Sequence, residues 1–208
     1  MTRITASHFA ECGGRQRARR SLVLTALVAA LSALAGHAVA GQPAATEPLV
    51  SVTEDQRVYS VSARFTVTSP AAIAFAVLTD YEAIPRFMPA VRSSVVLERR
   101  EGGALVEQEA VVRLLMFSKR IHLVLDVRED PGTIRFEDRC TKSFTHYKGS
   151  WTLTERDGET AIGYELAARP AFEMPEFLLK KLLKRDAVQM IEHLRAEIGA
   201  RSAATPPR

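Results

Sequence analysis

The middle of the chain is built from short segments in which apolar and polar residues alternate. Six such segments lie between residues 91 and 168, and a period of two predicts β-strands with one buried face. Their ranges are 91–100, 104–115, 119–129, 133–140, 146–155 and 160–168. Turns of hairpin length, such as Asp130-Pro131-Gly132, separate them. The pattern therefore predicts an antiparallel meander and argues against the alternating strands and helices of a parallel nucleotide-binding sheet.

Short helical segments precede this meander. An additional alternating strand, Arg57–Val67, is followed by a helix-start signal with Ser69 at the N-cap and Pro70 at the first helical position. A short helix over Ala71–Leu78 is expected next, and then a second short helical piece over Asp80–Pro85.

The last predicted element is a long amphipathic helix from Pro175 to about Gly199. Its apolar residues fall on one broad stripe, which must be buried against another element. The stripe consists of Phe177, Leu178, Leu182, Val188, Ile191, Leu194 and Ile198. This element order predicts an α+β fold in which the inner face of a curved antiparallel sheet meets the long helix, with the two short helices at one end.

Residues 1–40 have the features of an export signal. A basic patch ending in Arg19-Arg20 precedes an uncharged apolar run, Leu22–Ala35, and Ala38-Val39-Ala40 matches the pattern that signal peptidases cut. We therefore expect an exported, periplasmic protein that loses residues 1–40; both the general and the twin-arginine export routes stay open. Residues 41–55 are expected to be a linker and residues 201–208 a disordered tail, because neither shows periodicity.

Charge and cysteine content narrow the function classes. The chain has 28 basic and 24 acidic residues, but its first 40 residues hold five of the arginines and one of the acids. The remainder is formally neutral, so nucleic-acid binding is not predicted. Cys140, the one cysteine after the leader, is expected to be a small core residue. The histidines after the leader, His122, His146 and His193, are scattered, so no metal or cofactor is predicted.

Two motifs connect the chain to a known family. The segment Leu78–Pro89 contains the pattern DYxxxPxFxP, and the segment Gly149–Leu153 contains GxWxL. Together with the element order, these motifs resemble the START-like superfamily, in particular its polyketide cyclase/dehydrase and coenzyme Q-binding branch. The resemblance covers Gln56–Ile198, within a domain predicted over residues 56–200.

The resemblance implies a helix-grip fold, in which the sheet wraps the C-terminal helix and leaves a deep apolar cavity between them. Members of the family bind lipids, quinones, polyketides or hormones; some are cyclases or hydrolases, and many act only as carriers. From the residues alone, the same inward-facing apolar side chains would also suit a solid core.

The predicted cavity residues come from the short helices, the strands and the long helix. They are Tyr81, Phe87, Met88, Gln108, Leu123, Leu125, Phe136, Asp138, Tyr147, Trp151, Tyr164, Leu182 and Met190. Four of them, Gln108, Asp138, Tyr147 and Tyr164, are polar and would orient a ligand, since ligand pockets combine apolar walls with a few polar groups. Asp138 has a second interpretation, as a partly exposed residue at a strand end.

Three function hypotheses follow. The leading hypothesis is a carrier that binds a hydrophobic lipid, isoprenoid quinone or polyketide-like compound, with no catalytic residue assigned. The alternative is a cyclase/dehydrase-type enzyme that uses Tyr147, Tyr164 or Asp138 as acid or base. The third is an interaction module with a filled core.

A basic cluster lies near the start of the long helix. Its members are Lys180, Lys181, Lys184 and Arg185. Basic residues on an amphipathic helix suit peripheral contact with an anionic membrane, and they equally suit a solvated helix face.

Overall fold

The computed structural model describes residues 48–114 and 117–204. The predicted leader, residues 41–47 of the predicted linker and residues 205–208 lie outside this part. The described elements, in chain order, are β1 (Leu49–Asp55), β2 (Val58–Val67), α1 (Ala71–Thr79), the 3-10 helix η1 (Tyr81–Ala83), α2 (Ile84–Phe87), β3 (Val91–Arg100), β4 (Gly103–Leu114), β5 (Phe117–Asp130), β6 (Thr133–Asp138), β7 (Phe144–Arg156), β8 (Glu159–Pro170) and α3 (Glu176–Ala204).

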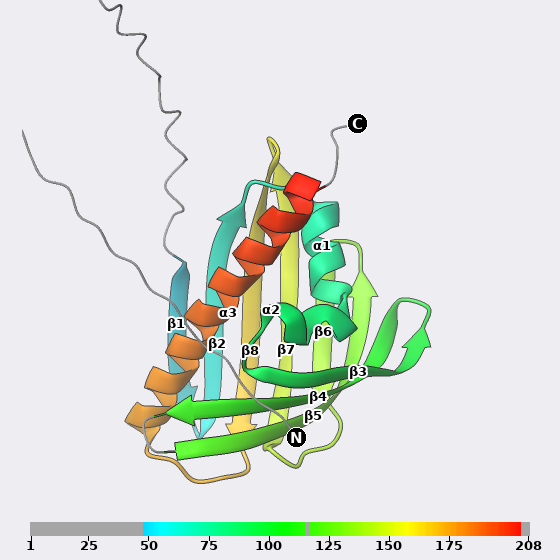
Figure 1. Ribbon diagram of the computed structural model, residues 1–208. Coiled ribbons are helices and arrows are strands. Elements are labelled where there is room, and N and C mark those ends of the chain that lie inside the picture. Colours follow the sequence, from blue (N-terminus) through cyan, green and yellow to red (C-terminus); the bar gives the residue numbers. More distant parts are fainter. Residues whose placement is uncertain (1–47, 115–116, 205–208) are drawn as a thin grey trace, which may run out of the picture. The chain divides into compact units, whose positions relative to one another are not determined.

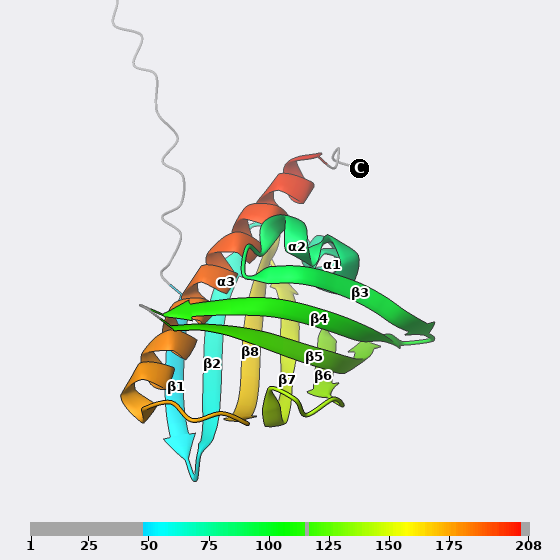
Figure 2. The ribbon, with the colours of Figure 1, turned by 60° about the horizontal axis from the view of Figure 1, so that its bottom comes forward.

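The eight strands form one sheet in which every neighbouring pair is antiparallel. The strand order is β1-β2-β8-β7-β6-β5-β4-β3. Strands β3 to β8 form the meander, and β2 pairs with its last strand, β8. The sheet is strongly curved: β3, β4 and β5 run across the direction of β2, β8 and β7 (Figure 1). Helix α3 lies along the concave face, and α1 and α2 cover its remaining opening (Figure 2). The predicted helix-grip architecture is therefore confirmed.

The first strand was not predicted, because its residues fall in the segment expected to be a linker. β1 pairs with β2 from Leu49 opposite Arg64 to Asp55 opposite Val58. The two strands are joined by Gln56 and Arg57, whose φ angles are 49° and 65°. A turn with two positive φ angles normally contains Asn or Gly. Because Gln56 and Arg57 are neither, the sequence does not indicate a turn here.

Helix α3 is longer than predicted and orients one residue differently. It continues to Ala204, so residues 201–204 are helical rather than part of a tail. Arg201 in this last turn forms an ion pair with Asp80, with 2.9 Å between Nη2 and Oδ2. Phe177, expected on the buried stripe, is 71% exposed, because Leu178 and Leu179 occupy the sheet-facing positions of the first turn.

The start of α1 also differs from the prediction. Pro70, rather than Ser69, is the N-cap, and no side chain within the cap forms a hydrogen bond to the helix. Glu155 from β7 supplies the capping hydrogen bond instead. The Oε2 atom of Glu155 accepts a hydrogen bond of 2.7 Å from the backbone N–H of Ala71. The Thr160 hydroxyl donates to the carbonyl of Ser69 at 2.6 Å. The β7–β8 hairpin thus holds the start of α1 in place.

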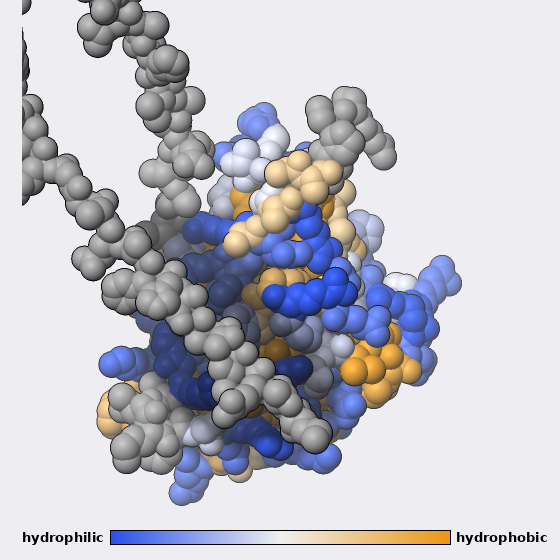
Figure 3. Space-filling view, viewed as in Figure 1, coloured by the Kyte–Doolittle hydropathy of each residue, from blue (hydrophilic) through white to orange (hydrophobic). Residues whose placement is uncertain are grey.

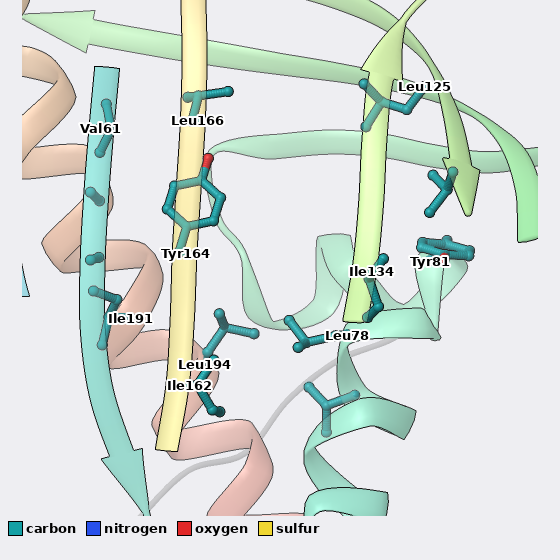
Figure 4. Packing of buried hydrophobic residues seen from close by; sticks show 14 of the residues in the cluster. Val61, Leu78, Tyr81, Leu125, Ile134, Ile162, Tyr164, Leu166, Ile191 and Leu194 are labelled. Carbon is teal, nitrogen blue, oxygen red and sulfur yellow. The ribbon is translucent and has the colours of Figure 1, made fainter. Parts of the chain in front are cut away.

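The core lies between the concave sheet face and α3. Ile191, Leu194 and Ile198 of the helix are almost fully buried and pack against the inward residues of β2 and β8. Figure 4 shows Val61 and Tyr164 of these strands facing the same interior as the helix side chains. A second, smaller cluster joins Tyr59 to Leu179 and Leu182 near the beginning of α3.

The outer surface differs in character from the interior. The face shown in Figure 3 is mainly hydrophilic, with apolar side chains in small separate groups. Within the described residues, no helix has both the length and the apolar content that crossing a membrane requires.

Candidate functional site

The interior of the domain is not completely filled. A cavity of about 590 Å³ lies between the concave face of the sheet, α3 and the short helices. Strands β4 to β8 form its walls, α3 bounds one side, and residues of α1, η1 and α2 cover it. The volume is within the range of roughly 300–1,000 Å³ that is typical of small-molecule sites.

One wall of the cavity is aromatic. Phe136 on β6, Tyr147 and Trp151 on β7 and Tyr164 on β8 all line it. The Trp151 and Tyr164 ring centroids are 4.4 Å apart, the Phe136 and Tyr147 centroids 6.0 Å, and the Phe136 and Tyr164 rings are stacked at 6.4 Å. These separations are those of favourable aromatic pairs, so the four rings form one connected surface.

Gly149 makes room for this surface. It lies on β7 between Tyr147 and Trp151, opposite Phe136 on β6 and Leu166 on β8. A Cβ atom at this position would lie 2.6 Å from Cζ of Phe136 and 2.3 Å from the carbonyl oxygen of Glu165. The glycine of the GxWxL motif is therefore required by the close approach of a ring and a neighbouring strand.

The two tyrosines of the aromatic wall remain neutral phenols at physiological pH. Burial is the main cause that raises the pKa of Tyr147 to about 12; the Tyr164 hydroxyl opposes this rise and the nearby Asp138 carboxylate adds to it. Burial likewise raises the pKa of Tyr164 well above its ordinary value, and the hydroxyls of the two tyrosines interact with each other. Both hydroxyls consequently stay protonated and can donate a hydrogen bond.

The cover of the cavity is fixed through Tyr81 of η1. Its hydroxyl donates a hydrogen bond of 2.7 Å to Oε1 of Glu129 on β5. The Arg99 guanidinium lies 5.3 Å from the Tyr81 ring centroid and 3.4 Å from the same Glu129 oxygen. Burial and the Glu129 carboxylate raise the pKa of Tyr81. The predicted cavity residues Phe87 and Met88 follow and line the cavity.

The remaining walls are mostly aliphatic. Leu123 and Leu125 of β5 and Met190 of α3 line the cavity as predicted. Gln108 of β4 also lines it, and its Nε2 donates to the Ser94 hydroxyl at 3.1 Å. Eleven of the thirteen predicted residues thus surround one space.

Two predicted residues do not line the cavity. Asp138 is buried, but its carboxylate accepts hydrogen bonds from the backbone N–H groups of Val124, Cys140 and Thr141, at 2.8, 3.1 and 3.0 Å. These bonds hold the end of β6 against β5, so its role is structural. Leu182 belongs to the second core cluster, against Tyr59. Cys140 is only partly buried, and its thiol lies 3.8 Å from the His122 carbonyl oxygen.

Three polar cavity residues were missed by the sequence analysis. Asp186, Gln189 and His193 of α3 line the cavity. Burial raises the pKa of Asp186, whose Oδ1 accepts hydrogen bonds from Nε and Nη2 of Arg185 at 3.0 and 2.8 Å. Asp186 lies four residues before Met190, and His193 lies three residues after it, so all three are on one side of the helix. This spacing could have indicated that the polar residues face the cavity.

Across residues 48–114 and 117–204, no group of three or more His, Cys, Asp and Glu side chains is arranged to hold a metal ion.

Comparisons with known proteins agree with this architecture. Residues 67–195 match the model of a family described as polyketide cyclase / dehydrase and lipid transport. The chain belongs to this family. The predicted relationship to START-like proteins is therefore confirmed. No protein in a search of curated proteins matches the chain.

Several solved structures resemble the chain in fold at low sequence identity. A STAR-related lipid transfer protein from Xanthomonas axonopodis matches with a TM-score of 0.62 and 18% identity, covering 76% of this chain and 96% of that protein. The Zhui aromatase/cyclase from Streptomyces sp. R1128 matches with a TM-score of 0.61 and 17% identity, covering 69% and 95%. The protein TTHA0849 from Thermus thermophilus matches with a TM-score of 0.59 and 19% identity, covering 69% and 99%. At these identities the likeness shows the fold.

Proposed function

We propose that this protein binds a hydrophobic small molecule in the cavity and acts as a carrier for it. The observation that supports this proposal is the cavity itself: about 590 Å³ of space, walled by aromatic and aliphatic side chains and covered by α1, η1 and α2. Burying apolar ligand surface there is favourable by roughly 25 cal/mol per Å². Lipids, isoprenoid quinones such as coenzyme Q and polyketide-like compounds are the ligand classes that suit such a space.

The experiment is a titration with N-phenyl-1-naphthylamine, an uncharged aromatic probe whose fluorescence rises in apolar surroundings. The wild-type protein is expected to bind it with saturation. Ala110 lines the cavity, so Ala110→Trp should abolish most of the signal by filling the space. Ala161 is exposed on β8, and Ala161→Trp is the matched control. Equal binding by all three proteins would show that the probe does not enter the cavity.

The alternative function is an enzyme of the cyclase/dehydrase type, which the family and the aromatase/cyclase neighbour both support. Asp138 does not line the cavity, and three backbone N–H groups donate hydrogen bonds to its carboxylate. The titratable groups of the cavity walls are instead Asp186 and His193 together with the tyrosines. Asp186 and His193 are seven residues apart on one helix, which separates them by about 10 Å along its axis.

Carrier and enzyme are distinguished by the fate of the bound compound. Incubation with a panel of polyketide-like substrates, followed by mass spectrometry of the extracted compounds, should return them unchanged from a carrier. A product that forms with the wild-type protein and not with Asp186→Asn would favour the enzyme.

We also propose that the start of α3 contacts a membrane surface during loading. Phe177 is 71% exposed, and Lys181 and Lys184 are exposed at helical spacings that bring them to the same side. Lys180 is paired with Glu176, and Arg185 with Asp186, so Lys181 and Lys184 carry the interaction. Sedimentation with phosphatidylglycerol vesicles should be lost in Phe177→Ala/Lys181→Glu/Lys184→Glu. Equal sedimentation of the triple variant would refute the contact.

Export is the remaining part of the proposed function. The basic patch, apolar run and Ala38-Val39-Ala40 pattern of the first 40 residues support cleavage after Ala40. The mass of the protein recovered from the periplasm of an expressing bacterium should then correspond to a chain that begins at Gly41. Recovery of the uncleaved chain in the cytoplasmic fraction would contradict it.

A further inference from the structure

The charges around the cavity are unevenly distributed. Among the described lining residues, none is a lysine or an arginine. Asp186 lines the cavity, and the Asp138 carboxylate lies close enough behind the wall to raise the pKa of Tyr147. Arg185, which is next to Asp186 on α3, is directed to Asp186 and to the carbonyl oxygen of Arg113. An anionic group that enters this space therefore finds no lysine or arginine among the described residues that line it.

The aromatic wall offers the cavity a hydrogen-bond donor. Tyr147 and Tyr164 are neutral, and two hydroxyls that interact with each other use at most one of their two hydrogens. Within the described residues, no third group forms a hydrogen bond with either hydroxyl. At least one O–H hydrogen consequently stays available to the cavity. A buried donor without an acceptor costs roughly 1–3 kcal/mol, so an acceptor on the ligand would be favoured.

We propose that the cavity selects uncharged ligands that present an oxygen acceptor, such as a ketone or ester carbonyl, to the hydroxyl pair of Tyr147 and Tyr164. The inference rests on the proposed function, since it specifies the ligand class of the same cavity. It excludes fatty acids and other compounds whose acidic group would enter the site, because an unpaired buried anion is strongly disfavoured. The aliphatic and aromatic walls hold the body of the ligand, and the tyrosine pair sets its orientation.

The charge part of the inference is tested with two probes that share a ring skeleton. N-Phenyl-1-naphthylamine is uncharged, whereas 8-anilinonaphthalene-1-sulfonate adds one sulfonate. At pH 8 the uncharged probe is expected to bind at least about tenfold more tightly. If neither probe binds, the proposed function fails. If both bind with equal affinity, the cavity function stands and the selection against anions is wrong.

The donor part is tested with 6-propionyl-2-(dimethylamino)naphthalene, an uncharged ketone whose emission moves to longer wavelength when its carbonyl accepts a hydrogen bond. The double variant Tyr147→Phe/Tyr164→Phe retains both rings and removes both hydroxyls. We expect its affinity for the ketone to fall about threefold to tenfold, the usual effect of one neutral hydrogen bond, and the bound emission to move to shorter wavelength.

The matched control is Tyr59→Phe, which removes the hydroxyl of a residue in the second core cluster, outside the cavity lining. Its ketone affinity and emission should equal those of the wild type. Binding of N-phenyl-1-naphthylamine by the double variant reports that the cavity is intact. Retained binding of that probe with unchanged ketone emission would overturn the role of the tyrosine pair.

Discussion

Gly149→Ala is the substitution whose effect the structure specifies most closely. The added Cβ would lie 2.3 Å from the Glu165 carbonyl oxygen and 2.6 Å from Cζ of Phe136. Both distances are far inside van der Waals contact. The ring can rotate away, but the carbonyl belongs to β8, which is paired with β7 along its length, so relief requires the strands to move.

The expected cost follows from overpacking. Inserting a methyl group into a packed site usually costs about 1–3 kcal/mol, and a clash with backbone belongs at the upper end. We therefore expect Gly149→Ala to lower the free energy of unfolding by about 2–3 kcal/mol. For a domain of this size that corresponds to a decrease in Tm of roughly 4–12 °C. Urea denaturation followed by circular dichroism measures the first quantity, and a thermal melt the second.

The chain contains its own control for a glycine-to-alanine change. Gly199 lies in α3, and a Cβ added there would meet nothing within 4 Å. Gly199→Ala should therefore stabilise the protein, by up to about 1 kcal/mol, through the better helix propensity of alanine. The reasoning is refuted if Gly149→Ala unfolds within about 0.5 kcal/mol of the wild type, a threshold set by the usual effect of surface substitutions.

Three further predictions concern stability. Asp138→Ala should lower the free energy of unfolding by about 3 kcal/mol or more, because three backbone N–H groups lose their acceptor, while the folded fraction still binds N-phenyl-1-naphthylamine. Tyr81→Phe should lower it by about 1.5 kcal/mol by removing the hydrogen bond to Glu129. Hydrogen bonds from Arg139 hold the pKa of Asp126 below its usual range, so its contribution is present above about pH 4 and is lost as the pH falls through the lowered folded-state pKa. The free energies of unfolding of the wild type and Asp126→Asn, measured by urea denaturation, should differ by on the order of 1 kcal/mol at neutral pH and become equal in acid.

Each of these predictions has an outcome that would contradict it. If Asp138→Ala is as stable as the wild type, water replaces the carboxylate as the acceptor. If its folded fraction no longer binds the probe, Asp138 contributes to the cavity after all. An unchanged unfolding midpoint for Tyr81→Phe would show that the cover is held by other contacts. If the free energies of unfolding of the wild type and Asp126→Asn differ by the same amount at every pH, the effect of the substitution comes from packing rather than from charge.

Alternation along the strands predicted which residues face the interior, but not what they do there. Phe136, Tyr147, Trp151 and Tyr164 line the cavity because period two places them on the concave face. Asp138 has the same phase and is also buried. Its strand ends at that residue, however, and the free N–H groups at the end take its carboxylate. Periodicity contains no information on where a ladder stops.

The helix shows a related limit. Its apolar stripe correctly predicted burial of Leu182, Ile191, Leu194 and Ile198. A stripe does not say which part of the sheet each turn meets, so Leu182 was expected in the cavity and instead packs against Tyr59. Polar residues on a helix are normally solvated, which is why Asp186 and its neighbours were not predicted to line the interior.

The first strand escaped prediction for a different reason. The alternation over Leu49–Asp55 is short, and the turn that follows is Gln56-Arg57, which lacks the glycine or asparagine expected at positive φ. Pairing with β2 is a long-range property of the sheet and stabilises this strand where local sequence does not.

Native mass spectrometry of the protein purified without detergent, with extraction and identification of any bound compound, tests the central claim most directly. The wild-type protein should retain an uncharged apolar molecule as an additional mass that organic solvent removes, and Ala110→Trp should show only the mass of the chain. A wild-type protein that carries no such molecule, and that also fails to bind N-phenyl-1-naphthylamine, would contradict the account.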